Sequence, residues 1–204
     1  MLDEAALRSA MDVLAAREPA IAAALGRIGY PAPRKRAPGY ETLLRTIVGQ
    51  QVSVAAATSM WTKLEATLGS GCTPKALLAQ DLDALRACGL SRQKQDYARS
   101  LAELVESGAL DLFALPIDDE EAIAQLVRIK GIGRWSAEIY LLFAEGRPDI
   151  WPAGDLAVQI SIGTLFGLPE RPSEKAIRDM AEAWRPHRGA MAIMAWHHYN
   201  TKVL

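Results

Sequence analysis

The apolar residues of this chain recur three and four positions apart over most of its length, which is the period of an amphipathic α-helix. Segments 3–16, 40–50 and 53–69 show the pattern first, and Asp3 and Ser53 stand where helix N-caps are expected. We find no convincing run with the alternation of period two that a half-buried strand requires. The pattern therefore predicts an all-α protein of about ten helices joined by short loops.

The helical pattern resumes after residues 29–40 and continues to the end of the chain. Residues 29–40 hold three prolines and a basic cluster, which is typical of a linker. Further helices are expected at 73–80, 81–89, 91–108, 118–129, 134–146, 155–167, 173–184 and 189–200.

Composition narrows the class of protein. The chain has 204 residues, 50% of them hydrophobic, which is enough for a sizeable core in one domain or two small lobes. The formal net charge is −1, so any surface that binds anions must be local. Two cysteines, Cys72 and Cys88, are too few for a four-thiolate iron–sulfur cluster or a disulfide framework. The low cysteine content favours a reducing cytosol, and we see no signal peptide or membrane span, so we expect a cytoplasmic protein. We also expect a monomer.

The stretch IKGIGRWSAEIY, residues 129–140, breaks the helical pattern between two helices of about 119–128 and 135–145. Gly131 and Gly133 permit a tight hairpin and a close approach to the backbone. The free N–H groups at the start of the second helix can bind a phosphate. Arg128, Lys130 and Arg134 add positive charge, which favours DNA. An ordinary helical hairpin with glycine caps is the alternative.

Four segments in order resemble the HhH-GPD superfamily of DNA glycosylases. LVRIKGIGRWSAEIY resembles its helix-hairpin-helix, and WPAGDLAVQ follows with Asp155 placed 20 residues after Trp135. Upstream, ETLLRTIVGQQVSVAAA resembles the helix–Gly-Gln–helix segment of the family. Downstream, WRPHRGAMAIMAWHHY resembles the alkylbase branch, the 3-methyladenine glycosylase II type. The resemblance spans about residues 30–200.

The resemblance implies a two-lobed helical fold and an activity. Lobe one would hold about 40–130, lobe two about 1–38 plus 131–204, and the helix-hairpin-helix about 119–145, with the active cleft between the lobes. The implied reaction is hydrolysis of the N-glycosidic bond of alkylated purines, 3-methyladenine and 7-methylguanine, after the base is flipped out of damaged double-stranded DNA.

Asp155 is the catalytic residue that the resemblance implies. An Asp titrates near 3.9 when unperturbed, so an ionised carboxylate can stabilise positive charge on the sugar and orient the attacking water. A helix N-cap is the commoner use of Asp before such a helix, and the two roles are compatible. Trp135 stands where lyase members of the family carry a lysine, so we expect hydrolysis without lyase activity.

Aromatic residues are implied to bind the flipped base. The candidates are Trp135, Trp196 and Tyr140, because an electron-rich ring attracts the cationic ring of an alkylated purine. Core packing is the alternative for each of them.

The resemblance also implies which residues contact the DNA backbone and which residue, the wedge, fills the space that a flipped base leaves. These residues lie in the hairpin and in two other loops. Gly131, Gly133, Lys130, Arg134, Gln50 and Gln51 are expected to contact DNA, and Leu90, Ser91 and Arg92 are candidates for the wedge that fills the gap left by the flipped base. A plain helix start at Ser91 is the alternative for the wedge segment.

The resemblance implies no required cofactor and no iron–sulfur cluster. It does imply a structural Na⁺ or K⁺ at the hairpin, held by the backbone carbonyls of Val127, Ile129 and Ile132. Two other functions stay open. One is a glycosylase for a deaminated or oxidised base, and the other is a non-catalytic helix-hairpin-helix module that only binds DNA.

Overall fold

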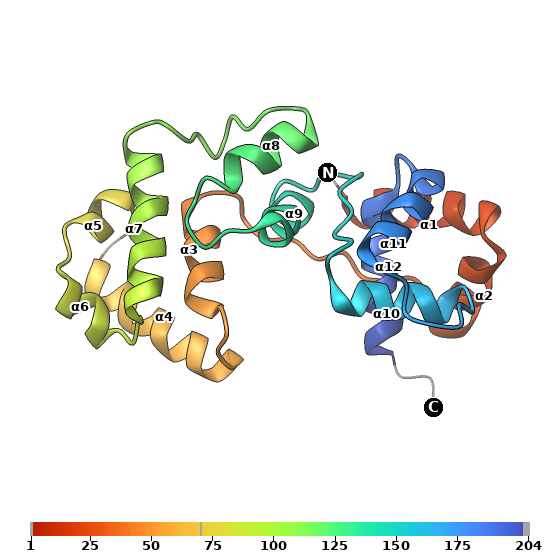
Figure 1. Ribbon diagram of the computed structural model, residues 1–204, viewed down its shortest axis with the longest axis horizontal. Helices are drawn as coiled ribbons and strands as arrows, with labels where there is room; N and C mark the ends of the chain where they lie inside the picture. The colour runs from red at the N-terminus through yellow and green to blue at the C-terminus, as the bar shows by residue number, and fades with distance from the viewer. Residues whose placement is uncertain (1, 70, 202–204) are drawn as a thin grey trace. The chain divides into compact units, whose positions relative to one another are not determined.

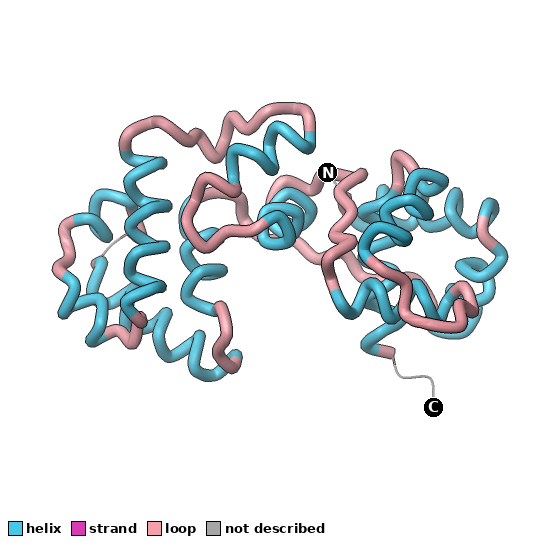
Figure 2. The backbone as a smooth tube through the Cα atoms, in the orientation of Figure 1, coloured by secondary structure: helices cyan, strands magenta, loops and turns pink. Residues whose placement is uncertain are grey.

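The computed structural model describes residues 2–69 and 71–201, and all regular elements within them are helices (Figure 1; Figure 2). The expected all-α fold is therefore confirmed. The chain forms two compact units, and each is described by itself. We call residues 36–140 the hairpin unit, and residues 2–35 with 141–201 the terminal unit.

The expected helices are found with shifts of a few residues at their ends. The hairpin unit holds α3 (Tyr40–Gly49), α4 (Val54–Leu68), α5 (Pro74–Leu78), α6 (Leu82–Ala87), α7 (Arg92–Glu106), α8 (Asp119–Leu126) and most of α9 (Arg134–Phe143). The terminal unit holds α1 (Glu4–Arg17), α2 (Pro19–Ile28), α10 (Leu156–Leu165), α11 (Glu174–Ala181), the short 3₁₀ helix η1 (Glu182–Trp184) and α12 (Arg188–Asn200).

Helix α2 was not anticipated from the sequence pattern. It begins at Pro19, directly after Glu18, which is the C-cap of α1 and the N-cap of α2 at once. Proline is favoured in the first helical turn because its missing N–H has no helical partner there. Ile21 and Ala24 are buried, so packing within the terminal unit supports a helix that carries no side-chain cap.

Side-chain caps explain why most helices begin where they do. The Ser53 hydroxyl accepts the N–H of Ala56 at 3.2 Å, as the sequence predicted for the start of α4. The Asp118 carboxylate accepts the N–H of Glu121 at 2.9 Å at the start of α8. Each cap satisfies an N–H that the helix itself leaves unpaired, which stabilises the helix by about 1 kcal/mol.

The core of the hairpin unit lies around α7, which packs against α3 and α5 (Figure 1). Leu43, Leu44 and Ile47 of α3 are fully buried, and Leu101 of α7 is also fully buried. Each such side chain contributes about 1.5–3 kcal/mol through the removal of apolar surface from water. The packing holds the carboxyl end of α3 in a fixed place, and this end carries Gln50.

The terminal unit is built around α12. Residues 189–196 of this helix are all buried, because α1 and α10 pack against it. Gly189 is required in this packing, since a Cβ at that position would lie 2.7 Å from the carbonyl oxygen of Pro148. This buried segment provides a rigid support for the Trp196 side chain.

The boundary between the units differs from the expected lobes. Residues 131–140 belong with the hairpin unit, whereas we expected lobe two to begin at 131. Contacts explain the difference. Gln50 Nε2 donates to the carbonyl of Gly131 at 2.9 Å, and the Tyr140 hydroxyl accepts the N–H of Gly39 at 2.7 Å. These bonds tie the hairpin and the first turns of α9 to the α3 side.

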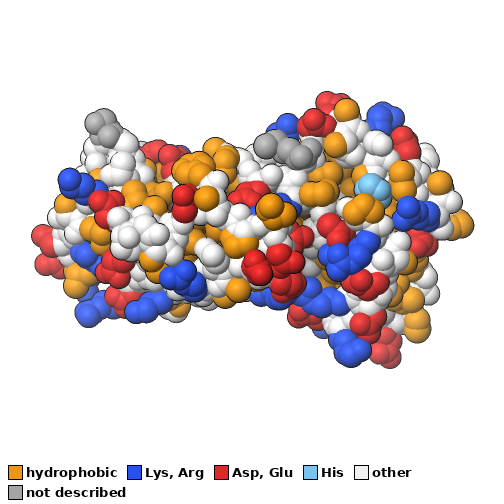
Figure 3. All heavy atoms as spheres, turned by 90° about the horizontal axis from the view of Figure 1, so that it is seen from above, with side chains coloured by type: hydrophobic (Ala, Val, Ile, Leu, Met, Phe, Trp, Pro, Cys, Tyr) orange, Lys and Arg blue, Asp and Glu red, His pale blue; other side chains and the backbone are white. Residues whose placement is uncertain are grey.

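Charged side chains of both signs are interspersed on the face shown in Figure 3, in keeping with the net charge of −1. In the part of the chain that is described, no helix is both long and apolar enough to cross a membrane.

Candidate functional site

The hairpin joins α8 to α9 through residues 127–133. The N–H of Ile132 donates to the carbonyl of Ile129 at 3.0 Å and closes the turn. Gly133 precedes α9, and its carbonyl accepts the N–H of Ala137 at 3.0 Å. The first turn of α9 therefore follows directly on the hairpin, and the N-terminal end of a helix is the end that favours an anion.

The two hairpin glycines serve different purposes. Gly131 has a φ of 81°, in the left-handed region, and a Cβ there would lie 2.1 Å from Cδ2 of Tyr97. The protein's own fold therefore requires glycine at 131. Gly133 has neither constraint, since its φ lies outside that region and a Cβ added there would have no neighbouring atom within 4 Å. An exposed glycine that the fold does not need leaves the backbone open to a ligand.

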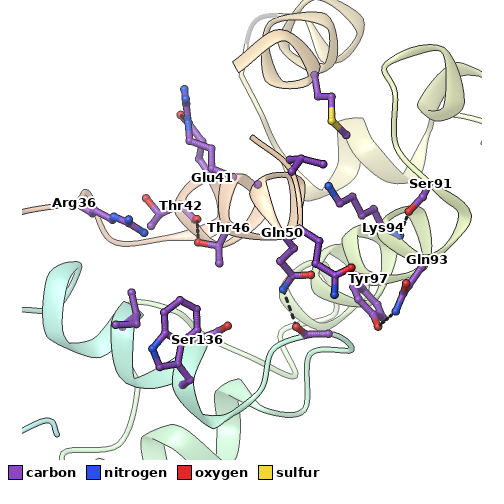
Figure 4. Close-up of a pocket in the computed structure, with 18 of the residues that line it drawn as sticks. Arg36, Glu41, Thr42, Thr46, Gln50, Ser91, Gln93, Lys94, Tyr97 and Ser136 are labelled. Carbon is purple, nitrogen blue, oxygen red and sulfur yellow. Dashed lines mark hydrogen bonds and ion pairs between the residues drawn. The ribbon is translucent and has the colours of Figure 1, made fainter. Parts of the chain in front are cut away.

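Contacts from α3 and α7 hold the hairpin in place. Gln50 at the end of α3 bonds the Gly131 carbonyl, and the Ser100 hydroxyl of α7 accepts the N–H of Lys130 at 3.1 Å. The Lys130 side chain is exposed. Gln50 was expected to contact DNA, and the structure gives it a supporting role under the turn (Figure 4).

The Arg134 side chain is engaged within the protein. Its guanidinium bonds both carboxylate oxygens of Glu120, one of them at 2.8 Å, and bonds the buried Glu138 carboxylate at 2.9 Å. These two carboxylates raise the pKa of Arg134 well above its usual value, the bond to Glu120 most of all. The side chain therefore links α8 to α9. Arg134 can contribute to an anion site through its backbone N–H.

An open pocket of about 1240 Å³ lies within the hairpin unit (Figure 4). Trp135, Ser136 and Ile139 of α9 line it together with Thr42 and Thr46 of α3. The bond between Gln50 and the hairpin crosses its middle, and Ser91, Gln93 and Lys94 line the other part (Figure 4). Trp135 is 47% exposed, so much of its ring is accessible for stacking.

Lys94 of α7 and Gln51 of the following loop shape the edge of this pocket. Lys94 is buried and donates from Nζ to the carbonyl of Val48 at 2.6 Å, and burial lowers its pKa. Gln51 is exposed and has a φ of 55°, a conformation that is costly for a residue with a Cβ. Such strain is concentrated at functional sites. The sequence placed Gln51 at the DNA surface but carried no signal of its strain.

Two of the three wedge candidates are occupied by structural roles. Leu90 is 2% exposed and fills the core of the hairpin unit. The Ser91 hydroxyl caps α7 by accepting the N–H of Lys94 at 3.3 Å, which is the alternative that the sequence left open. Arg92 is exposed. An apolar wedge from Leu90 would require this side chain to leave the core, so the structure argues against it.

Tyr140 also has a structural contact. It is 3% exposed, and its hydroxyl accepts the N–H of Gly39 at 2.7 Å. This bond fixes the segment before α3 against α9. The structure therefore favours a supporting role for Tyr140 over the base-stacking role that we expected.

Asp155 lies in the terminal unit at the start of α10. Its Oδ1 accepts the N–H of Val158 at 3.0 Å, so the residue is the N-cap of this helix. The same oxygen accepts the indole N–H of Trp196 at 3.2 Å. Trp196 is 8% exposed, and its ring lies 5.4 Å from that of Phe143. The carboxylate is therefore held by both a cap and a side chain from α12.

The carbonyls expected to bind a cation lie in the hairpin turn. That of Ile129 accepts the N–H of Ile132, and that of Val127 follows the last residue of α8. Backbone oxygens of this kind suit a hard cation such as Na⁺ or K⁺, so the residues present fit the group. Among the described residues, no cluster of three or more His, Cys, Asp or Glu side chains could hold a metal ion.

Comparison with known proteins reveals extensive similarity. The family model described as "HhH-GPD superfamily base excision DNA repair protein" matches residues 44–186. DNA-3-methyladenine glycosylase 1 of Schizosaccharomyces pombe is 34% identical over 161 residues, which cover 77% of this chain and 71% of that protein.

Several solved structures resemble this fold, among them two glycosylases. The DNA-3-methyladenine glycosidase of Bacillus halodurans gives a TM-score of 0.86 at 30% identity and covers 94% of this chain and 89% of its own. The 3-methyladenine DNA glycosylase of Schizosaccharomyces pombe in complex with abasic DNA gives 0.78 at 30% identity, covering 96% and 97%.

Proposed function

Because the chain belongs to the HhH-GPD superfamily of base excision DNA repair proteins, we propose that it is a DNA glycosylase for alkylated purines such as 3-methyladenine and 7-methylguanine. The observation that carries the proposal is the Asp155 carboxylate, oriented by a helix cap and an indole N–H. The similarity to glycosylases named for 3-methyladenine supports this substrate class. We propose that the enzyme acts as a monomer on damaged double-stranded DNA and requires no cofactor.

The hairpin is the proposed grip on the DNA backbone. A phosphate accepts hydrogen bonds from the first N–H groups of α9, and Gly133 permits the close approach. The exposed Lys130 adds a positive charge beside them. A cation on the carbonyls of the turn would add to the attraction for the phosphate.

Gln51 is the proposed residue that enters the duplex when the base is flipped. It is exposed in a strained turn, and the bonds of Gln50 to Gly131 and of Lys94 to Val48 anchor the residues that precede it. Because these anchors are formed before DNA binds, little further ordering is needed on insertion. This proposal takes the place of the wedge candidates Leu90 and Ser91, which have structural roles, and the exposed Arg92 stays a second candidate.

Trp135 is the proposed binding surface for the flipped base. Alkylation at N3 or N7 gives the purine a positive charge, and an indole face attracts such a ring by cation–π interaction worth up to about 2 kcal/mol when desolvated. Ser136 and Ile139 line the pocket beside it. The charged base is also a good leaving group, so little acid catalysis is needed.

Asp155 is the proposed catalytic residue. As the bond between C1′ and the base nitrogen breaks, its electron pair leaves with the base and positive charge develops on the sugar. The carboxylate stabilises this charge and orients the water whose oxygen forms the new bond to C1′, while the water proton passes to the carboxylate or to solvent. Trp135 offers no amine to attack the sugar, so hydrolysis is proposed without lyase activity.

The test is release of free base from methylated duplex DNA by the wild type and by Asp155→Asn. The amide keeps an oxygen for the helix cap but removes the charge, so we expect a loss of about 10²–10³-fold in the rate of release, with the thermal midpoint nearly unchanged. Asp81→Asn is the matched control, because Asp81 caps α6 through the N–H of Ala84 at 2.7 Å without a proposed role in chemistry.

The outcomes separate the candidate functions. Equal release by the wild type and Asp155→Asn would keep the glycosylase and exclude the carboxylate from its chemistry. Release only from DNA that carries deaminated or oxidised bases would change the substrate. DNA binding without release from any of these duplexes would indicate a module that only binds DNA.

A further inference from the structure

We propose that Trp196 is a positioning residue for Asp155, and that its indole N–H serves this purpose in place of stacking on the flipped base. The inference deepens the proposed function and rests on it. It assigns to α12 the task of holding the carboxylate in one orientation toward the sugar.

The indole of Trp196 is placed to act through its nitrogen. Nε1 donates to Asp155 Oδ1 at 3.2 Å, and the residue is 8% exposed. Phe143 lies against the ring, with 5.4 Å between the centroids and an angle of 41° between the planes. A ring that is buried and covered in this way offers little surface to a base, whereas the 47% exposed Trp135 offers a large one.

Two donors from different elements meet at one oxygen of Asp155. The N–H of Val158 comes from the first turn of α10, and the indole N–H comes from α12. The cap alone restrains Oδ1 from one direction only. The second donor restrains it from another direction, so the direction of Oδ2 is set as well. A positioned charge of this kind stabilises a developing cation better than one that must reorient.

The support behind the indole is rigid. Trp196 closes the fully buried run of α12, and the neighbouring helices of the terminal unit pack around that run. His197, the next residue, is bonded through Nε2 to the carbonyl of Ile28 at 2.9 Å. These contacts fix the backbone from which the indole projects.

The same unit provides a matched control. Trp184 is 1% exposed, and its Nε1 donates to the Glu18 carboxylate at 3.0 Å. Trp184→Phe therefore removes a buried indole donor to a carboxylate, as Trp196→Phe does, but at a place with no proposed chemistry. Loss of stability is expected to be similar in the two variants, and only one of them should change the behaviour of Asp155.

The experiment measures binding to two duplexes that carry no base at the test position. In one duplex a protonated pyrrolidine replaces the sugar, and in the other a neutral tetrahydrofuran does. The ratio of the two dissociation constants reports how well the carboxylate faces positive charge on the sugar ring. Because neither duplex has a base there, stacking on a base cannot contribute to the ratio.

We expect the wild type to prefer the cationic duplex, Asp155→Asn to lose the preference, and Trp196→Phe to reduce it about tenfold, since a hydrogen bond to a charged group is lost. Trp184→Phe should keep the wild-type ratio. The double variant of Asp155→Asn and Trp196→Phe should match Asp155→Asn alone, because the indole acts through the carboxylate. A wild-type ratio in Trp196→Phe would overturn the proposal.

A second measurement does not require a folded Trp196 variant. Hydrogen exchange of the Trp196 indole N–H, followed by NMR, should be slow in the wild type and fast in Asp155→Ala, and equal rates would also overturn the proposal. If the protein releases no base from methylated DNA but Trp196→Phe still reduces the preference for the cationic duplex, the proposed substrate is refuted and the positioning role is supported.

Discussion

Alanine substitution of each hairpin glycine tests whether that glycine is required for stability or for DNA binding. Gly131 and Gly133 look equivalent in the sequence, but only Gly131 has a positive φ and a close neighbour. We therefore expect Gly131→Ala to lower the free energy of unfolding and Gly133→Ala to lower the affinity for DNA.

The magnitude for Gly131→Ala follows from two costs. Alanine in the left-handed region costs about 1–2 kcal/mol relative to its preferred conformations. The new methyl group would lie 2.1 Å from Cδ2 and 2.5 Å from Cγ of Tyr97, so the ring must move, and overpacking of this kind costs about 1–3 kcal/mol. The sum is a loss of about 2–5 kcal/mol in the free energy of unfolding.

Gly133→Ala meets neither cost. No heavy atom lies within 4 Å of the added Cβ, and replacing glycine with alanine before the first turn of α9 should lower the free energy of unfolding by only about 0.5–1 kcal/mol. The methyl group would instead lie where the phosphate approaches the N–H groups of α9. We expect the affinity for duplex DNA to fall about tenfold, the equivalent of one lost charge-assisted hydrogen bond.

Urea titration followed by circular dichroism measures the first effect, and fluorescence anisotropy with a labelled duplex at one fixed salt concentration measures the second. The double variant Gly131→Ala with Tyr97→Ala should recover the steric part of the loss, apart from the cost of removing the ring. A Gly131→Ala protein as stable as the wild type would refute the steric reasoning, and a Gly133→Ala protein that binds DNA as tightly as the wild type would refute the phosphate contact.

The charged and titratable side chains give three further predictions. Arg134→Met should lower the free energy of unfolding by about 1–3 kcal/mol in a urea titration, because the guanidinium bonds the buried Glu138 carboxylate at 2.9 Å. Lys130→Ala should leave that stability unchanged but reduce the slope of log affinity for DNA against log salt by about 1, and an unchanged slope would count against a phosphate contact. Burial, followed by the charges of Arg27 and His197, lowers the pKa of His198 from its usual 6.5. The unfolded chain therefore takes up the proton first, and the free energy of unfolding falls as the pH drops below about 6.5. In urea titrations between about pH 7 and 5, the free energy of unfolding of His198→Gln should depend less on pH than that of the wild type.

Local sequence signals were sufficient for much of the fold. Asp3, Ser53 and Asp155 each accept the N–H three residues ahead, as their position before an apolar helical pattern predicts. Such caps depend only on residues within one turn, so the sequence shows them directly. Helix α2 was missed because it follows α1 without a loop and has no side-chain cap.

The sequence indicated which residues form the candidate site, but not what each side chain contacts or supports. The pattern of glycines and basic residues located the hairpin, and the resemblance to the family, through the spacing from Trp135, identified Asp155. Nothing near Gly131 in the sequence indicated Tyr97, and nothing near Arg134 indicated that Glu120 would bind its guanidinium. Both partners come from other helices.

The sequence by itself therefore determined where the helices other than α2, the hairpin and the capping carboxylate lie, because these depend on interactions across three or four residues. Only the tertiary structure decided that Leu90 is buried, that Gln51 is strained and exposed, and that Trp196 donates to Asp155 from 41 residues away. Burial and side-chain pairing depend on which elements pack together, and packing joins residues whose separation along the chain carries no signal of their contact.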